Sequence, residues 1–150
     1  AGEYMRRLKE RGLDKEIIDR SRQGQKIIGI CLGFQILTDY SEEDGGIECL
    51  GILKGSTKYI DGYKTHNGWD SFHLDARKFS ENLHIKKKQK KIVSGRVYFN
   101  HELRVELELS HASQLDNGIT SFSIQDNIFG FQFHPEKSQK AGQELLELII

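Results

Sequence analysis

Apolar residues recur at helical spacing near both ends of the chain. Tyr4, Met5 and Leu8 form a stripe on a predicted helix that ends near Gly12, and residues 14–23 are expected to form a second helix. The apolar stripe of the last predicted helix comprises Ala141, Leu145, Leu148 and Ile149. Such stripes are typical of helices that cover a sheet.

Short runs of apolar and β-branched residues between these helices predict strands. Residues 27–30, IIGI, are expected to form a buried strand. Turns are expected at residues 64–70, KTHNGWD, and at Asn117-Gly118. A chain of 150 residues has the size of one compact domain. The other predicted strands are residues 51–60, 96–101, 104–109, 120–124 and 128–133. Residues 96–101, 104–109 and 120–124 are expected to be strands of an antiparallel or mixed region.

Composition narrows the class of protein without identifying a partner. The chain is 37% hydrophobic and 29% charged with a formal net charge of zero, which gives no reason to expect a nucleic acid or an anionic membrane as partner. No apolar run reaches the roughly 20 residues that span a bilayer. The basic run at residues 86–91 favours a solvated loop over a phosphate contact. Two cysteines without metal or redox spacing fit a reducing, cytoplasmic compartment better than a disulfide.

The most informative stretch is residues 26–40, KIIGICLGFQILTDY. Here a buried strand leads through a glycine-flanked turn that carries Cys31 into a predicted helix extending to about Tyr40. This is the nucleophile-elbow pattern, with Cys where hydrolases often carry Ser. The helix N-terminus would lower the pKa of the thiol and supply N–H groups to an oxyanion. A buried structural Cys in a glycine-bearing turn fits the same stretch, so the stretch alone leaves both interpretations open.

A second signal follows the last predicted strand, where His134-Pro135-Glu136 stands. In an extended segment residues two apart face the same side, so His134 and Glu136 are expected to be neighbours. A Cys, a His beside it and a carboxylate that orients the His make a nucleophile, a base and an orienting group. Five other histidines show no such partner pattern and are expected to be structural: His66, His73, His84, His101 and His111.

These groups predict an acyl-transfer reaction. The Cys31 thiolate would attack a carbonyl carbon, and protonated His134 would give its proton to the leaving nitrogen and then activate water. The N–H of Leu32, at the start of the helix, is the expected oxyanion donor. Gln35 lies four residues after Cys31, on the same side of the predicted helix, and would either bond a small polar substrate or be an ordinary surface residue. No spacing suggests a metal site, and no cofactor is expected.

Two segments of the chain, GICLGFQIL and GFQFHPEKS, resemble the class I, or triad, glutamine amidotransferases. Within that family they are similar to the glutaminase subunit of imidazole glycerol phosphate synthase, an enzyme of histidine biosynthesis. THNGWD is similar to that family's HxGWN turn and VYFNH to its YFVHSY strand, so the likeness covers nearly the whole chain. The resemblance implies a three-layer, flavodoxin-like α/β fold, with a mostly parallel central sheet flanked by helices, in one amidotransferase domain over residues 1–150.

The resemblance also implies a triad of Cys31, His134 and Glu136 that hydrolyses glutamine to glutamate and ammonia. The ammonia would pass through a tunnel to a (β/α)8-barrel synthase or cyclase subunit in a heterodimer. Ala1-Gly2 looks like the tail of the family's PGxG oxyanion strand, which would place further strands before Ala1. The resemblance implies five substrate-binding residues: Gly2, Leu32, Gly33, Gln35 and Glu43. Of these, Gln35 and Glu43 fall at positions that hold the α-amino and carboxylate end of glutamine.

Two departures from the family pattern keep other functions open. Glu102-Leu103 replaces Ser-Tyr after the His of YFVHSY, and Asp70 replaces the Asn of GWN. A carboxylate at Glu102 would repel the substrate if it pointed inward. Such changes would suit a related amidotransferase of surface-sugar biosynthesis or a non-catalytic scaffold of the same fold. An unrelated cysteine hydrolase or peptidase is a third hypothesis.

Overall fold

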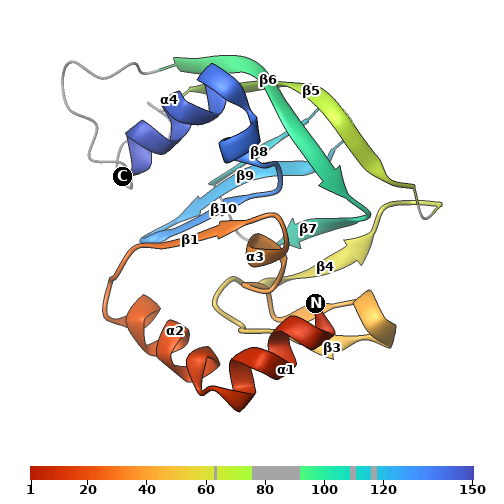
Figure 1. Ribbon diagram of the computed structural model, residues 1–150, viewed down its shortest axis with the longest axis vertical. Helices are drawn as coiled ribbons and strands as arrows, with labels where there is room; N and C mark the ends of the chain where they lie inside the picture. The colour runs from red at the N-terminus through yellow and green to blue at the C-terminus, as the bar shows by residue number, and fades with distance from the viewer. Residues whose placement is uncertain (63, 76–91, 109–110, 116–117) are drawn as a thin grey trace.

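The computed structural model describes residues 1–62, 64–75, 92–108, 111–115 and 118–150. Within these ranges the strands form three sheets, and helices lie on both sides of them (Figure 1). No helix in the described ranges is long and apolar enough to cross a membrane. The predicted basic loop at residues 86–91, His84 and Asn117 all lie outside the described residues.

The first sheet has the strand order β1-β10-β9-β8 and lies at the centre of the molecule (Figure 1). Its strands are β1 (Ile27–Ile30), β8 (His111–Gln114), β9 (Thr120–Gln125) and β10 (Ile128–Phe131). β1 runs parallel to β10, whereas β10 and β8 each run antiparallel to β9. Every residue of β10 is buried, so this strand forms the middle of the core.

The second sheet has the order β3-β2-β4-β7. Its strands are β2 (Tyr40–Ser41), β3 (Ile47–Glu48), β4 (Gly55–Tyr59) and β7 (Leu103–Leu107). Of its pairs, β2–β4 is parallel and the other two are antiparallel. The expected mostly parallel sheet is therefore wrong, and the sheets are mixed, because strands close in sequence such as β9 and β10 are joined by short turns that allow only antiparallel pairing.

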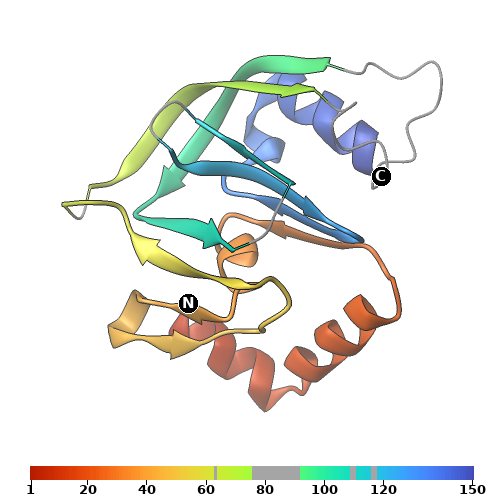
Figure 2. The same cartoon turned by 180° about the vertical axis from the view of Figure 1, so that it is seen from behind.

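A long antiparallel ribbon of β5 (His66–Asp75) and β6 (Ile92–His101) curves over one end of the molecule (Figures 1 and 2). The turn expected at residues 64–70 is wrong, because β5 already begins at His66. Gly68, with a φ of 143°, continues the strand instead of reversing it. The register pairs His66 with His101, which brings two histidines together at the end of the ribbon.

Of the four α-helices within the described ranges, two match their predicted extents closely. They are α1 (Gly2–Glu10) and α2 (Leu13–Arg22), joined at Gly12, which has a φ of 67°. α4 (Gln139–Ile149) packs against β6 (Figure 1) and buries the predicted apolar stripe.

The helix expected to reach Tyr40 is a single turn, α3 (Leu32–Gln35). The Thr38 hydroxyl ends the helix, because it lies 2.8 Å from the carbonyl oxygen of Gln35 and 3.1 Å from that of Tyr40. The chain then enters β2 at Tyr40, where the sequence pattern had predicted continued helix. This short helix places Cys31 and Gln35 at its two ends.

The core has two parts that meet at α3 and β10. One lies between the first sheet, the β5–β6 ribbon and α4, and includes the fully buried Phe99, Phe131 and Phe133. The other lies around α3 and α1, and includes the fully buried Phe34. The turn at Cys31 therefore stands between two packed clusters, which restrict its movement.

Candidate active site

Cys31 joins β1 to α3 in a strained backbone conformation. Its φ of 51° and ψ of −110° lie where residues with side chains are rarely found. Such a conformation costs on the order of 1–3 kcal/mol, so the surrounding structure must impose it. A strained residue at a sharp strand-to-helix turn is the geometry of a nucleophile elbow. The structure therefore provides the elbow that the sequence predicts.

Hydrogen bonds and a glycine hold this elbow. The N–H of Cys31 donates to the carbonyl of Phe131 at 2.6 Å, and the carbonyl of Cys31 accepts the N–H of Phe34 at 3.0 Å. A Cβ at Gly130 would lie 2.1 Å from the ring of Phe34. The helix can therefore pack directly on β10 only because Gly130 has no side chain.

Sheet register brings Cys31 and His134 to the same edge of the first sheet. Ile30, the last residue of β1, pairs with Phe131, the last residue of its parallel neighbour β10. Cys31 follows the first strand directly, and His134 comes three residues after the second. In α/β proteins the carboxyl ends of adjacent parallel strands are where functional side chains gather.

Glu136 orients the ring of His134. The Nδ1 atom of His134 lies 2.7 Å from Oε1 of Glu136, so the two residues are neighbours as expected. They are not in an extended segment, because Pro135–Lys137 form the 3₁₀ turn η3 with His134 at its N-cap. The N–H of His134 donates to the carbonyl of Tyr98 at 2.9 Å and fixes the backbone. With Nδ1 engaged, Nε2 is the ring nitrogen left for proton exchange.

Burial raises the pKa of the Cys31 thiol above its usual value. The N–H of Leu32 opposes that rise, the carboxylate of Glu136 adds to it and Lys137 opposes it. The start of α3 lowers this pKa through the N–H of Leu32, as expected, but desolvation outweighs that contribution and the net pKa is raised. Cys31 therefore needs a base to become a thiolate, and His134 is a base at the same edge of the sheet.

The N–H groups expected to stabilise an oxyanion come from different local structures. Leu32 and Gly33 are the first two residues of α3, where a helix has N–H groups without helical acceptors. Gly2 is not the tail of a strand, as its sequence suggested, but the first residue of α1, and its N–H donates to Oδ2 of Asp44 at 3.0 Å. The oxyanion roles of Leu32, Gly33 and Gly2 remain predictions, although Gly2 lies in a helix and not in a strand.

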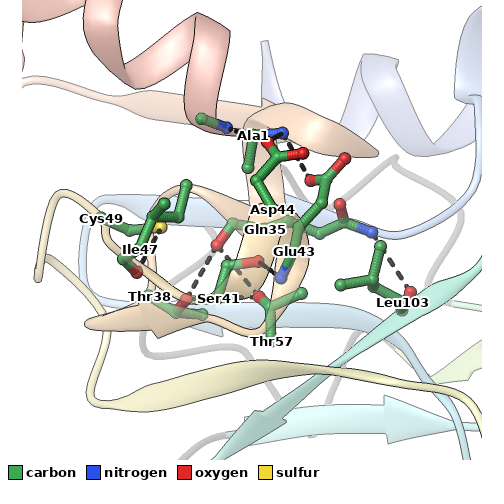
Figure 3. Close-up of polar contacts among 11 residues, drawn as sticks. Ala1, Gln35, Thr38, Ser41, Glu43, Asp44, Ile47, Cys49, Thr57 and Leu103 are labelled. Carbon is green, nitrogen blue, oxygen red and sulfur yellow. Dashed lines mark hydrogen bonds and ion pairs between the residues drawn. The ribbon is translucent and has the colours of Figure 1, made fainter.

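Gln35 is buried at the end of α3 and not a surface residue (Figure 3). Its Nε2 donates to the carbonyl of Leu103 at 3.2 Å and lies 3.5 Å from Oε1 of Gln132. The hydroxyl of Thr57 donates to its backbone carbonyl at 3.1 Å. Gln35 therefore has a fixed orientation, which a side chain needs if it is to hydrogen-bond a small polar substrate.

Glu43 belongs to the 3₁₀ turn η1 (Glu43–Gly45), between β2 and β3. Its Oε2 lies 2.5 Å from the ammonium group of Ala1, and the carboxylate of Asp44 lies 3.7 Å from the same ammonium (Figure 3). Glu43 and Asp44 therefore both lie beside the start of α1, and the role of Glu43 toward glutamine remains a prediction.

Two histidines that sequence analysis had classed as structural form a pair beside this site. Nδ1 of His66 lies 3.0 Å from Nε2 of His101, and Nε2 of His66 lies 3.5 Å from Oδ2 of Asp70. Pairing the segments THNGWD and VYFNH as neighbouring strands would have placed these two histidines together, but the sequence predicts a turn for the first segment. No group of three or more described His, Cys, Asp or Glu side chains is arranged to hold a metal ion.

Of the two departures from the family pattern, Asp70 lies within β5 beside His66, and Glu102-Leu103 follows the end of β6. Glu102 is exposed and accepts a hydrogen bond from the hydroxyl of Thr65 at 3.4 Å, so it does not point inward to repel a substrate. Leu103 is buried, and its backbone carbonyl, which any residue would supply, accepts the hydrogen bond from Gln35. The departures therefore leave the buried polar contacts around Gln35 in place.

Comparison with known proteins gives concordant matches. Residues 6–149 match the family "Glutamine amidotransferase class-I". The chain is 38% identical to the imidazole glycerol phosphate synthase subunit HisH of Oceanobacillus iheyensis, with 95% of this chain and 71% of that protein covered. It is 37% identical to the HisH of Aquifex aeolicus, over 97% of this chain and 70% of that one. In fold it is similar to PurLQS from Thermotoga maritima, with a TM-score of 0.63 and 20% identity over 91% of this chain and 66% of that chain.

Proposed function

Because the chain belongs to the class I glutamine amidotransferase family, we propose that it is the glutaminase subunit of an imidazole glycerol phosphate synthase, in histidine biosynthesis. The observation that carries this proposal is the His134–Glu136 pair, at 2.7 Å, at the same sheet edge as the strained Cys31. Those three residues are the proposed triad, in one amidotransferase domain over residues 1–150.

The proposed reaction begins when His134 takes the thiol proton of Cys31. The thiolate attacks the side-chain carbonyl carbon of glutamine and forms a tetrahedral intermediate, whose oxyanion the N–H groups of Leu32 and Gly33 would stabilise. Collapse of this intermediate breaks the C–N bond, and His134 returns the proton to the leaving nitrogen, which departs as ammonia. Water, deprotonated by His134, then cleaves the thioester and releases glutamate.

Glutamine would be held at its α-amino and carboxylate end. Glu43 would pair with the α-ammonium group, and Gln35 would provide an oriented amide.

The released ammonia needs an acceptor. The similar proteins are named as subunits of a synthase, which suggests that the acceptor is bound by another subunit. We propose a cyclase subunit with a (β/α)8 barrel as partner in a heterodimer, with ammonia passing through a tunnel between the subunits. Both cysteines are free thiols, which fits a reducing cytoplasm as the proposed compartment.

Glutamate release from glutamine, measured with the cyclase subunit present, tests this function. The Cys31→Ala variant should lose the activity, and the Cys49→Ala variant should keep it, because Cys49 is the other free thiol and lies at the end of β3. A glutamine analogue with an electrophilic side chain should label Cys31 stoichiometrically. Glutaminase activity retained by Cys31→Ala would refute the mechanism.

The other hypotheses give different results in the same assay. A non-catalytic scaffold would release no glutamate and leave Cys31 unlabelled. A peptidase would cleave peptides and not glutamine. An amidotransferase of surface-sugar biosynthesis would hydrolyse glutamine but would not be activated by the histidine-pathway cyclase.

A further inference from the structure

A chain of hydrogen bonds leads from the outer ribbon to the buried amide of Gln35. It starts at Nδ1 of His66, which lies 3.0 Å from Nε2 of His101. Asp70 lies 3.5 Å from the other ring nitrogen of His66, Nε2, which can donate to that carboxylate only in the protonated ring, so Asp70 is not part of the chain in the neutral state. Nδ1 of His101 then lies 2.6 Å from the carbonyl oxygen of Leu103. That same carbonyl accepts the Nε2–H of Gln35 at 3.2 Å, so the chain ends on a proposed substrate-binding residue.

The acceptors determine where the protons of this chain lie. A carbonyl oxygen can only accept, so Nδ1 of His101 must carry the hydrogen that bonds to Leu103. In a neutral imidazole the other nitrogen is then an acceptor, so Nε2 of His101 receives a hydrogen from Nδ1 of His66. A proton added to His101 would place two N–H groups face to face and break the chain at that point.

Packing keeps both rings in place and disfavours their charged forms. His101 is 6% exposed, and the ring of His66 stacks on the fully buried Phe99 at 4.3 Å between centroids. Burial lowers the pKa of His101 to about 4, opposed by the Leu103 carbonyl and assisted by His66 and His134. Burial also lowers the pKa of His66, although the nearby carboxylate of Asp70 opposes this shift. Both rings are therefore neutral at pH 7, as the hydrogen-bond chain requires.

The backbone held by this pair faces the reacting groups on two sides. At one end, the carbonyl of Asn100 lies 3.7 Å from Sγ of Cys31. At the other, the carbonyl of Leu103 holds Gln35. His101 lies between these two residues in sequence, so its ring anchors the segment whose carbonyls contact both the nucleophile and the substrate-binding amide.

We propose that His66 and His101 are positioning residues of the glutaminase, which fix the Leu103 carbonyl and through it the orientation of Gln35 toward glutamine. This inference rests on the proposed function. Neither ring needs to touch the substrate: His101 bonds directly to the carbonyl, and His66 holds His101 in the tautomer that can donate to it. Losing the outer hydrogen bond should therefore weaken glutamine binding more than it slows the chemical step.

Kinetics of glutamine hydrolysis by two His66 variants, assayed with the cyclase subunit, test this role. His66→Leu keeps an apolar group against Phe99 but cannot donate to His101, and it should raise KM for glutamine about threefold to tenfold, the effect of one neutral hydrogen bond, with kcat within about twofold. His66→Asn carries Nδ2 near the position of Nδ1 and should restore KM to within about twofold of wild type. Equal KM values for wild type and His66→Leu, or no rescue by His66→Asn, would overturn the proposal.

Nitrogen NMR of the histidine rings separates failure of this proposal from failure of the proposed function. In the wild-type protein we expect His101 as the Nδ1–H tautomer, neutral at pH 6. A His101 ring that is an Nε2–H tautomer, or is protonated at that pH, would overturn the positioning role even in an active glutaminase. A wild-type protein that hydrolyses no glutamine would refute the proposed function and this role with it, whatever tautomer the ring adopts.

Discussion

Nδ1 of His134 lies 2.7 Å from Oε1 of Glu136, and this contact sets which ring nitrogen can face the nucleophile. Glu136→Gln keeps the size of the side chain but removes the negative charge that favours the Nδ1–H tautomer and the imidazolium. Since the Glu136 side chain is 50% exposed, solvent screens part of its effect. We expect kcat to fall about tenfold to a hundredfold, less than for a fully buried orienting carboxylate.

Steady-state glutaminase assays measure this effect. The control is Glu48→Gln, an exposed carboxylate on β3, which should leave kcat unchanged. An unaltered kcat in Glu136→Gln would mean that the carboxylate does not orient His134 during catalysis.

The backbone strain at Cys31 should affect the free energy of unfolding. Its φ of 51° and ψ of −110° are acceptable to glycine and unfavourable for alanine. Of two inactive variants, Cys31→Gly should therefore be more stable than Cys31→Ala by about 1 kcal/mol, although glycine usually costs stability through the entropy of the unfolded chain. Urea denaturation of both variants checks the difference, and a less stable Cys31→Gly would show that the elbow is not strained.

Local patterns predicted the two halves of the site, and long-range pairing determined the rest. The elbow at Cys31 and the closeness of His134 and Glu136 follow from residues adjacent or nearly adjacent in sequence, and the family inferred from them is confirmed. The His66–His101 pair depends on strand register that brings together residues 35 positions apart, and Asn67-Gly68 suggested a turn near the start of β5.

Tertiary contacts also explain why the extent of α3 and the sheet type were mispredicted. Thr38 contacts the hydroxyl of Thr57 on β4 at 3.3 Å and ends the helix that the apolar pattern would have continued. Pairing between strands is mixed because β1 finds its parallel partner β10 about a hundred residues later, whereas β9 meets β10 through a short turn. Neither the end of α3 nor the direction of strand pairing is determined within one segment of the chain.

Glu43 should contribute to glutamine binding rather than to bond cleavage. If its carboxylate holds the α-ammonium group of glutamine, as proposed, Glu43→Gln replaces a charge-assisted hydrogen bond with a neutral one. We expect KM for glutamine to rise about tenfold to a hundredfold with kcat within about threefold. Glu48→Gln serves again as the control, and a fall in kcat at constant KM would place Glu43 in the chemical step instead.

Close packing of α3 on β10 should make Gly130 intolerant of substitution. A Cβ there would lie 2.1 Å from the ring of Phe34, which is fully buried and has no room to move. Gly130→Ala should lower the free energy of unfolding by about 3 kcal/mol and displace the elbow. The matched control is Gly33→Ala, where the added Cβ meets no atom within 4 Å and stability should change by less than about 1 kcal/mol.

Acid should destabilise the fold through His101. The pKa of this ring is about 4 in the folded protein, against 6.5 for an exposed histidine, because burial disfavours the imidazolium. Between those two values the unfolded chain binds one more proton than the folded one, so the stabilisation is complete above about pH 6.5 and is lost as the pH falls toward 4. The loss from this residue alone should reach about 2 kcal/mol at pH 5.

His101→Asn isolates that contribution, because asparagine does not titrate but carries Nδ2 near the position of Nδ1, within reach of the Leu103 carbonyl. Surface carboxylates with lowered pKa values, such as Asp39 beside Lys54, add their own acid dependence to both proteins and cancel in the comparison. Urea denaturation at pH 7, 6 and 5 should show the stability advantage of the wild type shrinking as the pH falls. Parallel pH profiles for the two proteins would mean that His101 has the same pKa in the folded and unfolded states, so that burial does not keep its ring neutral below pH 6.5.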